Sequence, residues 1–179
     1  MKTFFAGVVV LLILLLLPVF SPGTEQEKRD KVLEKQWSMN EVVNKKLGTD
    51  LKTAELDHYI VHFDIPANDF TRQLPAVLKG LYSKFSAIFK FSKEEKLWNG
   101  KLVIYFWNRR SDFIRFAKAF DGFDARAAGG YFRFKKRDVH INIPYESVSG
   151  NDQTRDAWMF EVLCHEASHA FLQFYKTPV

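Results

Sequence analysis

The stretch from Asn151 to Lys176 contains neither proline nor glycine, and it constrains the fold more than any other part of the chain. Asn151, Asp152 and Thr154 are residue types that cap the N-terminus of a helix. Apolar residues then recur at intervals of three and four positions, as they do along one side of an α-helix: Phe160, Leu163, Ala167, Phe171 and Phe174. The pattern predicts a long amphipathic helix whose apolar side packs on a core.

Five consecutive residues in this helix match the HExxH pattern of zinc hydrolases: His165-Glu166-Ala167-Ser168-His169. His165 and His169 share one side of a helix, so both imidazoles can reach one metal ion at about 2.0–2.1 Å. Glu166 lies about 100° further round the helix, where a carboxylate can act as a general base without binding the metal. We therefore predict that His165 and His169 bind Zn²⁺ opposite the apolar side, with Glu166 as the catalytic base. The alternative is a polar helix face that matches by chance.

The N-terminus has the features of a targeting segment. Lys2 precedes an uncharged apolar run from Phe4 to Leu17, and Ser21-Pro22-Gly23 offers small residues for cleavage before Thr24. We predict that residues 1–23 are a signal peptide. An uncleaved anchor is the alternative, because Phe4 to Phe20 is near the lower limit for spanning a bilayer. Either reading places the protein outside the cytoplasm, secreted or at the envelope, with membrane contact only through an uncleaved N-terminus.

Composition limits the remaining classes. Hydrophobic residues make up 47% of the chain and aromatic residues 16%, which is ample for a packed core and argues against disorder. The net charge is +5, but the basic residues are scattered except around Arg133 to Arg137, where we expect a solvated hairpin tip. We therefore expect no nucleic-acid partner. The single cysteine, Cys164, points away from His165 on a helix, so we expect a small buried thiol and not a metal ligand.

The periodicity predicts an α+β fold with a small mixed or antiparallel sheet and packed helices. Residues 24–55 read as a charged, weakly packed leader helix with Gly48 as its stop, and residues 56–179 as the folded domain. The segment His58 to Ile65 alternates as a strand that leaves His58 and His62 facing solvent, about 13 Å apart and unable to share a metal. Lys101 to Trp107 reads as a buried strand, and Tyr131 to Ile143 as a hairpin with Phe132 and Phe134 facing inward.

Three segments together resemble the gluzincin-like metallopeptidases of the peptidase MA superfamily, in particular its secreted bacterial members. They are His58 to Pro66, Gly129 to Phe132, and Leu163 to Ala170. The resemblance spans roughly Leu56 to Tyr175. It implies a fold like the N-terminal subdomain of zincins, ending in the HExxH helix, and a peptide or protein substrate hydrolysed at a zinc ion held by His165 and His169.

The resemblance also implies a substrate cleft. The strand Val139 to Ile143 would be the edge strand along which a peptide adds by β-augmentation. His140, Asn142 and Tyr145 would then be candidate cleft residues, although His140 and Asn142 could equally be ordinary surface residues. Tyr131, Tyr145 and His140 are unranked candidates for the donor that stabilises the oxyanion.

One departure from the family pattern concerns the third zinc ligand. A catalytic zinc has three protein ligands and a water, and in gluzincins the third ligand is a Glu on a later helix. No Asp, Glu, His or Cys follows His169, and Glu161 to His169 would span about 12 Å along one helix, too far for one ion.

Three explanations are open. The domain is incomplete at its C-terminus, which we expect most, or an upstream group or a second chain completes the site, or the enzyme is inactive. The last explanation gives the alternative function, a catalytically inactive module of the same fold with a binding or structural role at the cell envelope. In an unrelated envelope protein with a chance motif, His165 and His169 would instead be buried and bonded to the core.

Overall fold

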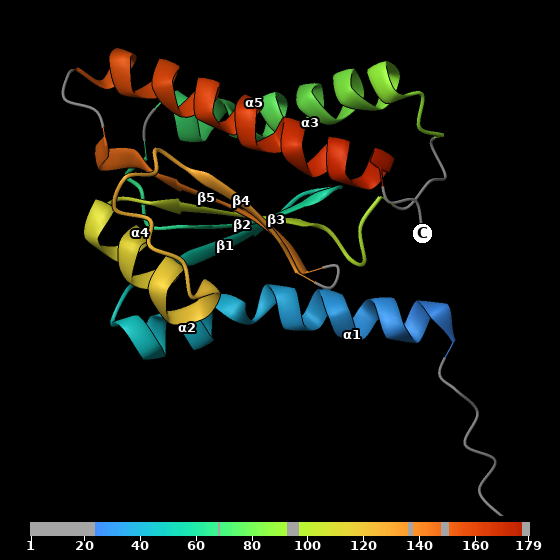
Figure 1. Ribbon diagram of the computed structural model, residues 1–179, viewed down its shortest axis with the longest axis horizontal. Helices are drawn as coiled ribbons and strands as arrows, with labels where there is room; N and C mark the ends of the chain where they lie inside the picture. The colour runs from blue at the N-terminus through green and yellow to red at the C-terminus, as the bar shows by residue number, and fades with distance from the viewer. Residues whose placement is uncertain (1–23, 68, 93–96, 136–137, 148–150, 177–179) are drawn as a thin grey trace, which may run out of the picture.

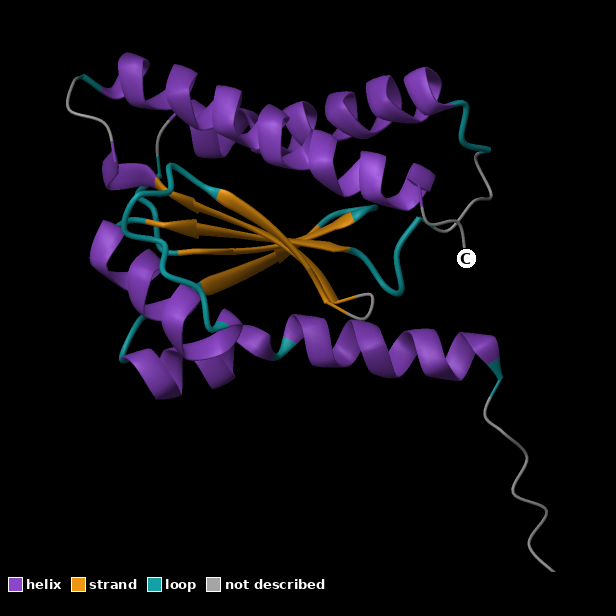
Figure 2. Ribbon diagram, in the orientation of Figure 1, coloured by secondary structure: helices purple, strands orange, loops and turns teal. Residues whose placement is uncertain are grey.

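The computed structural model describes residues 24–67, 69–92, 97–135, 138–147 and 151–176. Within these ranges, helices cover both faces of one sheet, which gives three layers (Figures 1 and 2). The helices are α1 (Glu25–Trp37), α2 (Met39–Leu47), α3 (Asp69–Phe89), α4 (Arg110–Phe116) and α5 (Asp152–Lys176), with a π-helical turn η1 (Ala117–Asp121) and a 3-10 turn η2 (Tyr145–Ser147). The strands are β1 (Lys52–Glu55), β2 (Tyr59–Phe63), β3 (Leu102–Trp107), β4 (Tyr131–Lys135) and β5 (Asp138–Pro144).

The sheet of the described residues has five strands in the order β1-β2-β3-β5-β4. The three central strands β2, β3 and β5 are parallel, and β1 and β4 run antiparallel to their neighbours at the two edges. Central strands need apolar residues on both sides when helices cover both faces, and every residue of β3 is buried. The predicted α+β class with a mixed sheet is confirmed.

The first core lies between the sheet and the helices α3 and α5. Alternate residues of the central strands face it, including Val61, Ile104 and Ile141. From α3 it receives Leu74, Leu78 and Leu81, and from α5 it receives Met159, Leu163, Ala167, Ala170 and Phe171. This core fixes α5, and with it the motif, across one face of the sheet (Figure 1).

A second core fills the opposite face of the sheet, under α2, α4 and the turn η1. Val43, Leu47 and Leu51 are buried there against Ile60 and Trp107. The expectation of a weakly packed leader helix over residues 24–55 is therefore corrected in part. It agrees with α1, which has no buried residue, and with the stop at Gly48 (φ +67°). It does not agree with α2, which packs on this core, or with the edge strand β1. Alternation in β2 indicated one buried face, but it could not show that the N-terminal segment covers the other.

The expectation that His62 faces solvent is wrong, because α1 covers it. His62 has no exposed surface. Its Nδ1 lies 2.9 Å from the Thr53 hydroxyl oxygen, and its Nε2 lies 3.0 Å from the Gln36 carbonyl oxygen. The Gln36 side chain also bonds the backbone N–H and carbonyl of Lys101. His58 is half-buried and stacks on Tyr82 with a centroid separation of 3.4 Å.

The predicted hairpin is present as the antiparallel pair β4 and β5, whose expected turn falls partly on residues outside the described ranges. The assignment of the edge strand is corrected, however. β5 lies inside the sheet between β3 and β4, so the edge next to α5 is β4. Phe132 packs on the first core as expected, whereas the expectation that Phe134 faces inward is wrong, because Phe134 is 41% exposed.

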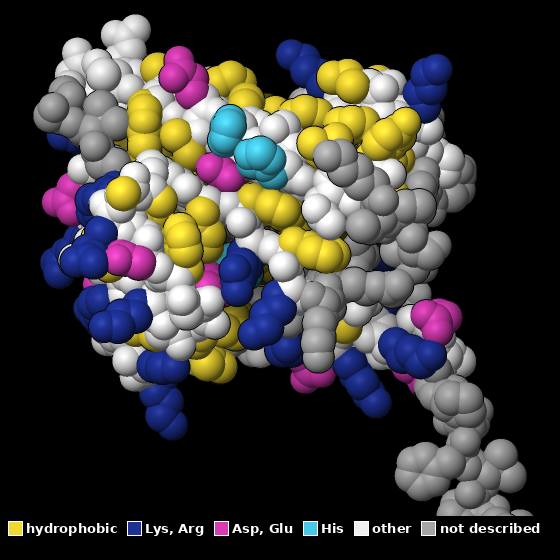
Figure 3. Space-filling view, in the orientation of Figure 1, with side chains coloured by type: hydrophobic (Ala, Val, Ile, Leu, Met, Phe, Trp, Pro, Cys, Tyr) yellow, Lys and Arg dark blue, Asp and Glu magenta, His cyan; other side chains and the backbone are white. Residues whose placement is uncertain are grey.

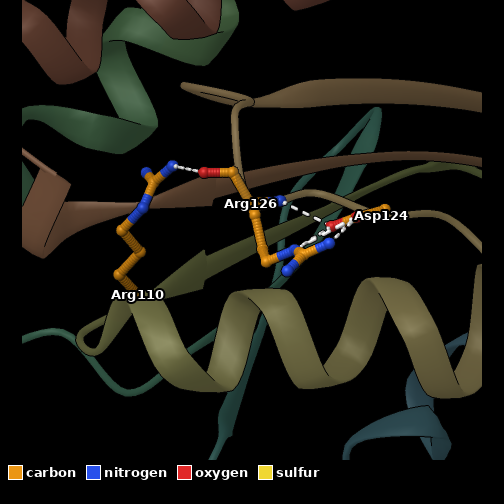
Figure 4. A network of polar contacts seen from close by, with 3 residues as sticks. All are labelled: Arg110, Asp124 and Arg126. Atoms are coloured by element: carbon orange, nitrogen blue, oxygen red, sulfur yellow. Dashed lines mark hydrogen bonds and ion pairs between the residues drawn. The ribbon is translucent and has the colours of Figure 1, made fainter.

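The loop between η1 and β4 is tied to α4 by Arg110. Its guanidinium donates to the carbonyl oxygens of Arg126 (2.8 Å) and Ala128 (3.0 Å). Arg126 in turn bonds the exposed carboxylate of Asp124 (Figure 4). These contacts set the path of the chain into Gly130 and β4.

Residues 1–23, which we expect to be a signal peptide or anchor, lie outside the described residues. Among the helices that are described, none combines the length and the apolar character needed to cross a bilayer.

Candidate functional site

Helix α5 presents its motif histidines to solvent at the surface of the molecule. His165 and His169 are exposed, whereas Leu163, Ala167 and Phe171 are at most 1% exposed on the opposite side. Figure 3 shows the histidine side chains next to each other over α5. The expectation that Phe160 belongs to the buried apolar side of this helix is wrong. Phe160 is 44% exposed, and Met159 is buried in the core instead.

The two imidazoles face each other with a spacing that suits a metal. His165 Nε2 and His169 Nε2 are 3.2 Å apart, and the ring planes are nearly perpendicular, at 87°. Two nitrogen ligands of a tetrahedral zinc ion, each at about 2.0–2.1 Å, lie about 3.3–3.4 Å from each other. The donor pair therefore fits two positions of a zinc site. The same contact without a metal is a hydrogen bond in which one ring donates and the other accepts.

Glu166 lies near the two histidines and contacts the edge of the sheet. It is only 8% exposed, and the backbone N–H of Phe132 in β4 donates a hydrogen bond to its carboxylate. Burial raises the pKa of Glu166, and the nearby imidazoles and the Phe132 amide oppose this shift only in part. A carboxyl whose pKa is raised holds a transferred proton better at neutral pH.

Gly130 allows α5 to approach β4 this closely. A Cβ atom at position 130 would lie 2.6 Å from Val162 Cγ1, 3.2 Å from the Asn142 carbonyl oxygen and 3.7 Å from Glu166 Cγ. At the neighbouring Gly129, a Cβ would meet only Trp158, at 3.5 Å. The lack of a side chain at position 130 thus leaves room for α5 to pack close enough for Glu166 to contact the edge strand.

We expect Gly130→Ala to destabilise the protein by about 1–3 kcal/mol, because the added methyl group overpacks the contact between α5 and β4. Gly129→Ala is the matched control, since its methyl group makes only an ordinary contact. Urea unfolding of the two variants measures the difference. Equal stabilities would show that the close approach at Gly130 does not constrain the fold.

The described residues do not supply a third metal ligand. Among them, no group of three or more His, Cys, Asp or Glu side chains is arranged to hold a metal ion. Cys164 is partly buried and packs on the first core, and burial raises the pKa of its thiol.

The proposed cleft residues are not brought together with the motif. Asn142 is fully buried and accepts a hydrogen bond from Trp107 Nε1 (3.1 Å). His140 lies 2.9 Å from Asp121, which the Tyr131 hydroxyl also contacts. These contacts are on the sheet face opposite α5, because Val139, Ile141 and Ile143 take the side that faces α5.

The expectation that His140 and Asn142 line a cleft beside the motif is therefore corrected, and Tyr131 and His140 are removed as oxyanion donors. Tyr145 is on the α5 side, but it is 4% exposed within the first core. Sequence reasoning missed the Phe132 amide and Gly130. The pair Gly129-Gly130 before a strand was the available signal for a close backbone approach.

No family model matches the chain, and comparisons with curated proteins and with solved structures gave no match.

Proposed function

We propose that this protein is a zinc-dependent metallopeptidase that hydrolyses peptide bonds. The observation that supports this most is the geometry of the motif on α5. The two Nε2 atoms are separated by 3.2 Å, as two zinc ligands would be, and Glu166 is buried one residue away beside the edge strand. Helical spacing alone brings the two imidazoles together. The burial of Glu166 and its hydrogen bond with the Phe132 amide are the further support, because a chance match to the motif does not require them.

In this proposal His165 and His169 hold the zinc ion. Bound zinc would lower the pKa of a coordinated water toward about 7 and polarise the scissile carbonyl. Glu166 accepts the proton of the attacking water and then passes it to the leaving amine. The raised pKa of Glu166 favours this role, because a base is most effective when its pKa is near the working pH.

The substrate would be an extended peptide. β4 pairs with β5 on one side only, so its other side is the sheet edge nearest Glu166. An edge strand can bind an extended peptide through backbone hydrogen bonds. We place this activity outside the cytoplasm, on the basis of the apolar N-terminal sequence.

Metal removal tests the proposal. We expect the chain to bind one zinc ion, to lose peptide hydrolysis when a chelator removes it, and to recover the activity when zinc is restored. His165→Ala and His169→Ala should each abolish zinc binding, whereas His58→Ala should not. Metal analysis and a fluorogenic peptide library provide the readouts. Metal-independent hydrolysis, or zinc binding that survives both substitutions, would refute the assignment.

One observation favours a second candidate, a catalytically inactive module of the same fold. The described residues lack a third ligand, and a catalytic zinc site requires three. Such a module would serve a binding or structural role at the cell envelope. The same experiment tests this candidate. Absence of both zinc binding and peptide cleavage in the folded protein, with His165 and His169 exposed, would support it.

A further inference from the structure

A cavity of about 340 Å³ lies on the far side of the sheet from the motif. Its walls come from α1, from η1 and from the sheet face formed by β3, β4 and β5. This volume is at the lower end of the roughly 300–1,000 Å³ typical of small-molecule pockets. The cavity is separated from His165 and His169 by the sheet, so it is not part of the proposed zinc site.

The polar part of the cavity is basic. Lys35, Arg133 and Lys135 line it, and Asp121 is the only carboxylate among its lining residues in the described part of the chain. Figure 3 shows Lys and Arg side chains gathered between α4 and α1 on the visible face. Arg133 and Lys135 against the one Asp121 carboxylate leave a net positive charge that attracts a negatively charged ligand.

Arg133 has an unmet hydrogen-bonding requirement. Its Nη2 donates to the Asp121 carbonyl oxygen at 3.3 Å, but its Nε is buried and has no acceptor. A buried N–H without a partner costs about 1–3 kcal/mol. A guanidinium presents its donors in a planar fork that matches a carboxylate. The Arg133 side chain lines the cavity, so a carboxylate bound there can pair with it.

Asp121 offsets one of these positive charges, and two other groups hold its carboxylate in place. The Tyr131 hydroxyl donates to it at 2.6 Å, and His140 Nε2 lies 2.9 Å from the same oxygen. Burial would raise the pKa of Asp121, but the hydrogen bonds from His140 and Tyr131, together with the electrostatic attraction of His140 and Arg133, outweigh burial and lower it. The Asp121 carboxylate is thus held by Tyr131 and His140, whereas the Arg133 guanidinium bonds the Asp121 backbone carbonyl.

The rest of the cavity wall is apolar. Phe116 and Phe120 stack with a centroid separation of 4.9 Å, and Met39 and Val32 line the helical side. An inorganic anion would leave this surface uncovered. A ligand that fills the cavity therefore needs an apolar part as well as a negative charge.

We propose that this cavity binds a small amphipathic carboxylate, such as a medium-chain fatty acid. The carboxylate pairs with the Arg133 guanidinium and lies near Lys135. The hydrocarbon chain packs against Phe116, Phe120 and Met39. This is a binding function separate from the proposed hydrolysis at α5.

Titration calorimetry of the full chain with decanoate, below its micelle concentration, tests the proposal. We expect decanoate to bind with a stoichiometry of one, and decanol and decylamine to bind at least about tenfold more weakly, because neither supplies an acceptor anion for Arg133. Arg133→Gln should weaken decanoate binding by about ten- to a hundredfold. Lys118→Gln is the control, because Lys118 is exposed and does not line the cavity.

Three results would overturn the proposal: no binding of decanoate, equal binding of decylamine, or unchanged affinity in Arg133→Gln. The comparison of the three ligands uses the unmodified protein, so it is decisive even where the Arg133 variant folds poorly. Circular dichroism of the variants separates a loss of binding from a loss of structure.

Discussion

Replacing Glu166 with glutamine should lower peptide hydrolysis by about 10²–10⁴-fold while zinc remains bound. The amide keeps the size of the side chain and its capacity to accept from the Phe132 amide, but it cannot take a proton from water. The proposed metal ligands are the imidazoles of His165 and His169, and Glu166 is not one of them, so the substitution leaves both ligands in place. Hydrolysis and metal binding should therefore separate in this variant.

Glu161→Gln is the matched control, because Glu161 is exposed on the same helix one turn earlier. The kcat/KM for a fluorogenic peptide and the zinc content should be measured for both variants. Full activity in Glu166→Gln would exclude the proposed mechanism. Loss of zinc together with activity would show that Glu166 acts on the metal site and not as a base.

The stability of the protein should fall by about 3 kcal/mol between pH 7 and pH 4 because of His62 alone. Burial lowers the pKa of His62 from 6.5 to about 4, against the hydrogen bond with the Gln36 carbonyl. Well above pH 6.5 the imidazole is neutral in both the folded and the unfolded state, so His62 does not reduce the free energy of unfolding. As the pH falls below 6.5, the unfolded chain binds a proton that the folded protein excludes, so unfolding becomes easier until about pH 4.

Urea unfolding at several pH values measures this effect in the wild type and in His62→Gln. We expect the pH-dependent loss to be smaller by about 3 kcal/mol in the variant, because glutamine does not titrate. The His58→Gln variant should show most of the pH-dependent loss of stability that the wild type shows, since His58 is only half-buried. The same pH dependence in the wild type and in His62→Gln would show that His62 does not resist protonation in the folded state.

Local patterns were sufficient for the elements that carry one strong periodic signal. The helix over Asp152–Lys176, the buried strand Leu102–Trp107 and the stop at Gly48 follow from spacing, β-propensity and left-handed backbone geometry, which neighbouring residues decide. The histidine pair was also predictable, because positions i and i+4 of a helix are always neighbours.

The contacts between distant segments were not predictable in this way. Alternation along a strand shows which residues share a face, but it does not show what covers that face. His62 and Asn142 look like surface residues in the sequence, yet both are buried. Gln36 supplies a hydrogen-bond partner for His62, and Trp107 supplies one for the Asn142 side-chain oxygen, each from another element. A polar side chain can be buried at low cost only when such a partner exists.

The sequence by itself determined the α+β class, the motif helix and the identity of His165, Glu166 and His169, because each depends on residues close together in the chain. Only the tertiary structure decided that β4 is the edge strand and that the Phe132 amide holds Glu166. It also decided that the N-terminal helices enclose a basic cavity. The physical reason is that strand order and helix packing depend on long-range burial of apolar surface, which acts between residues far apart in sequence.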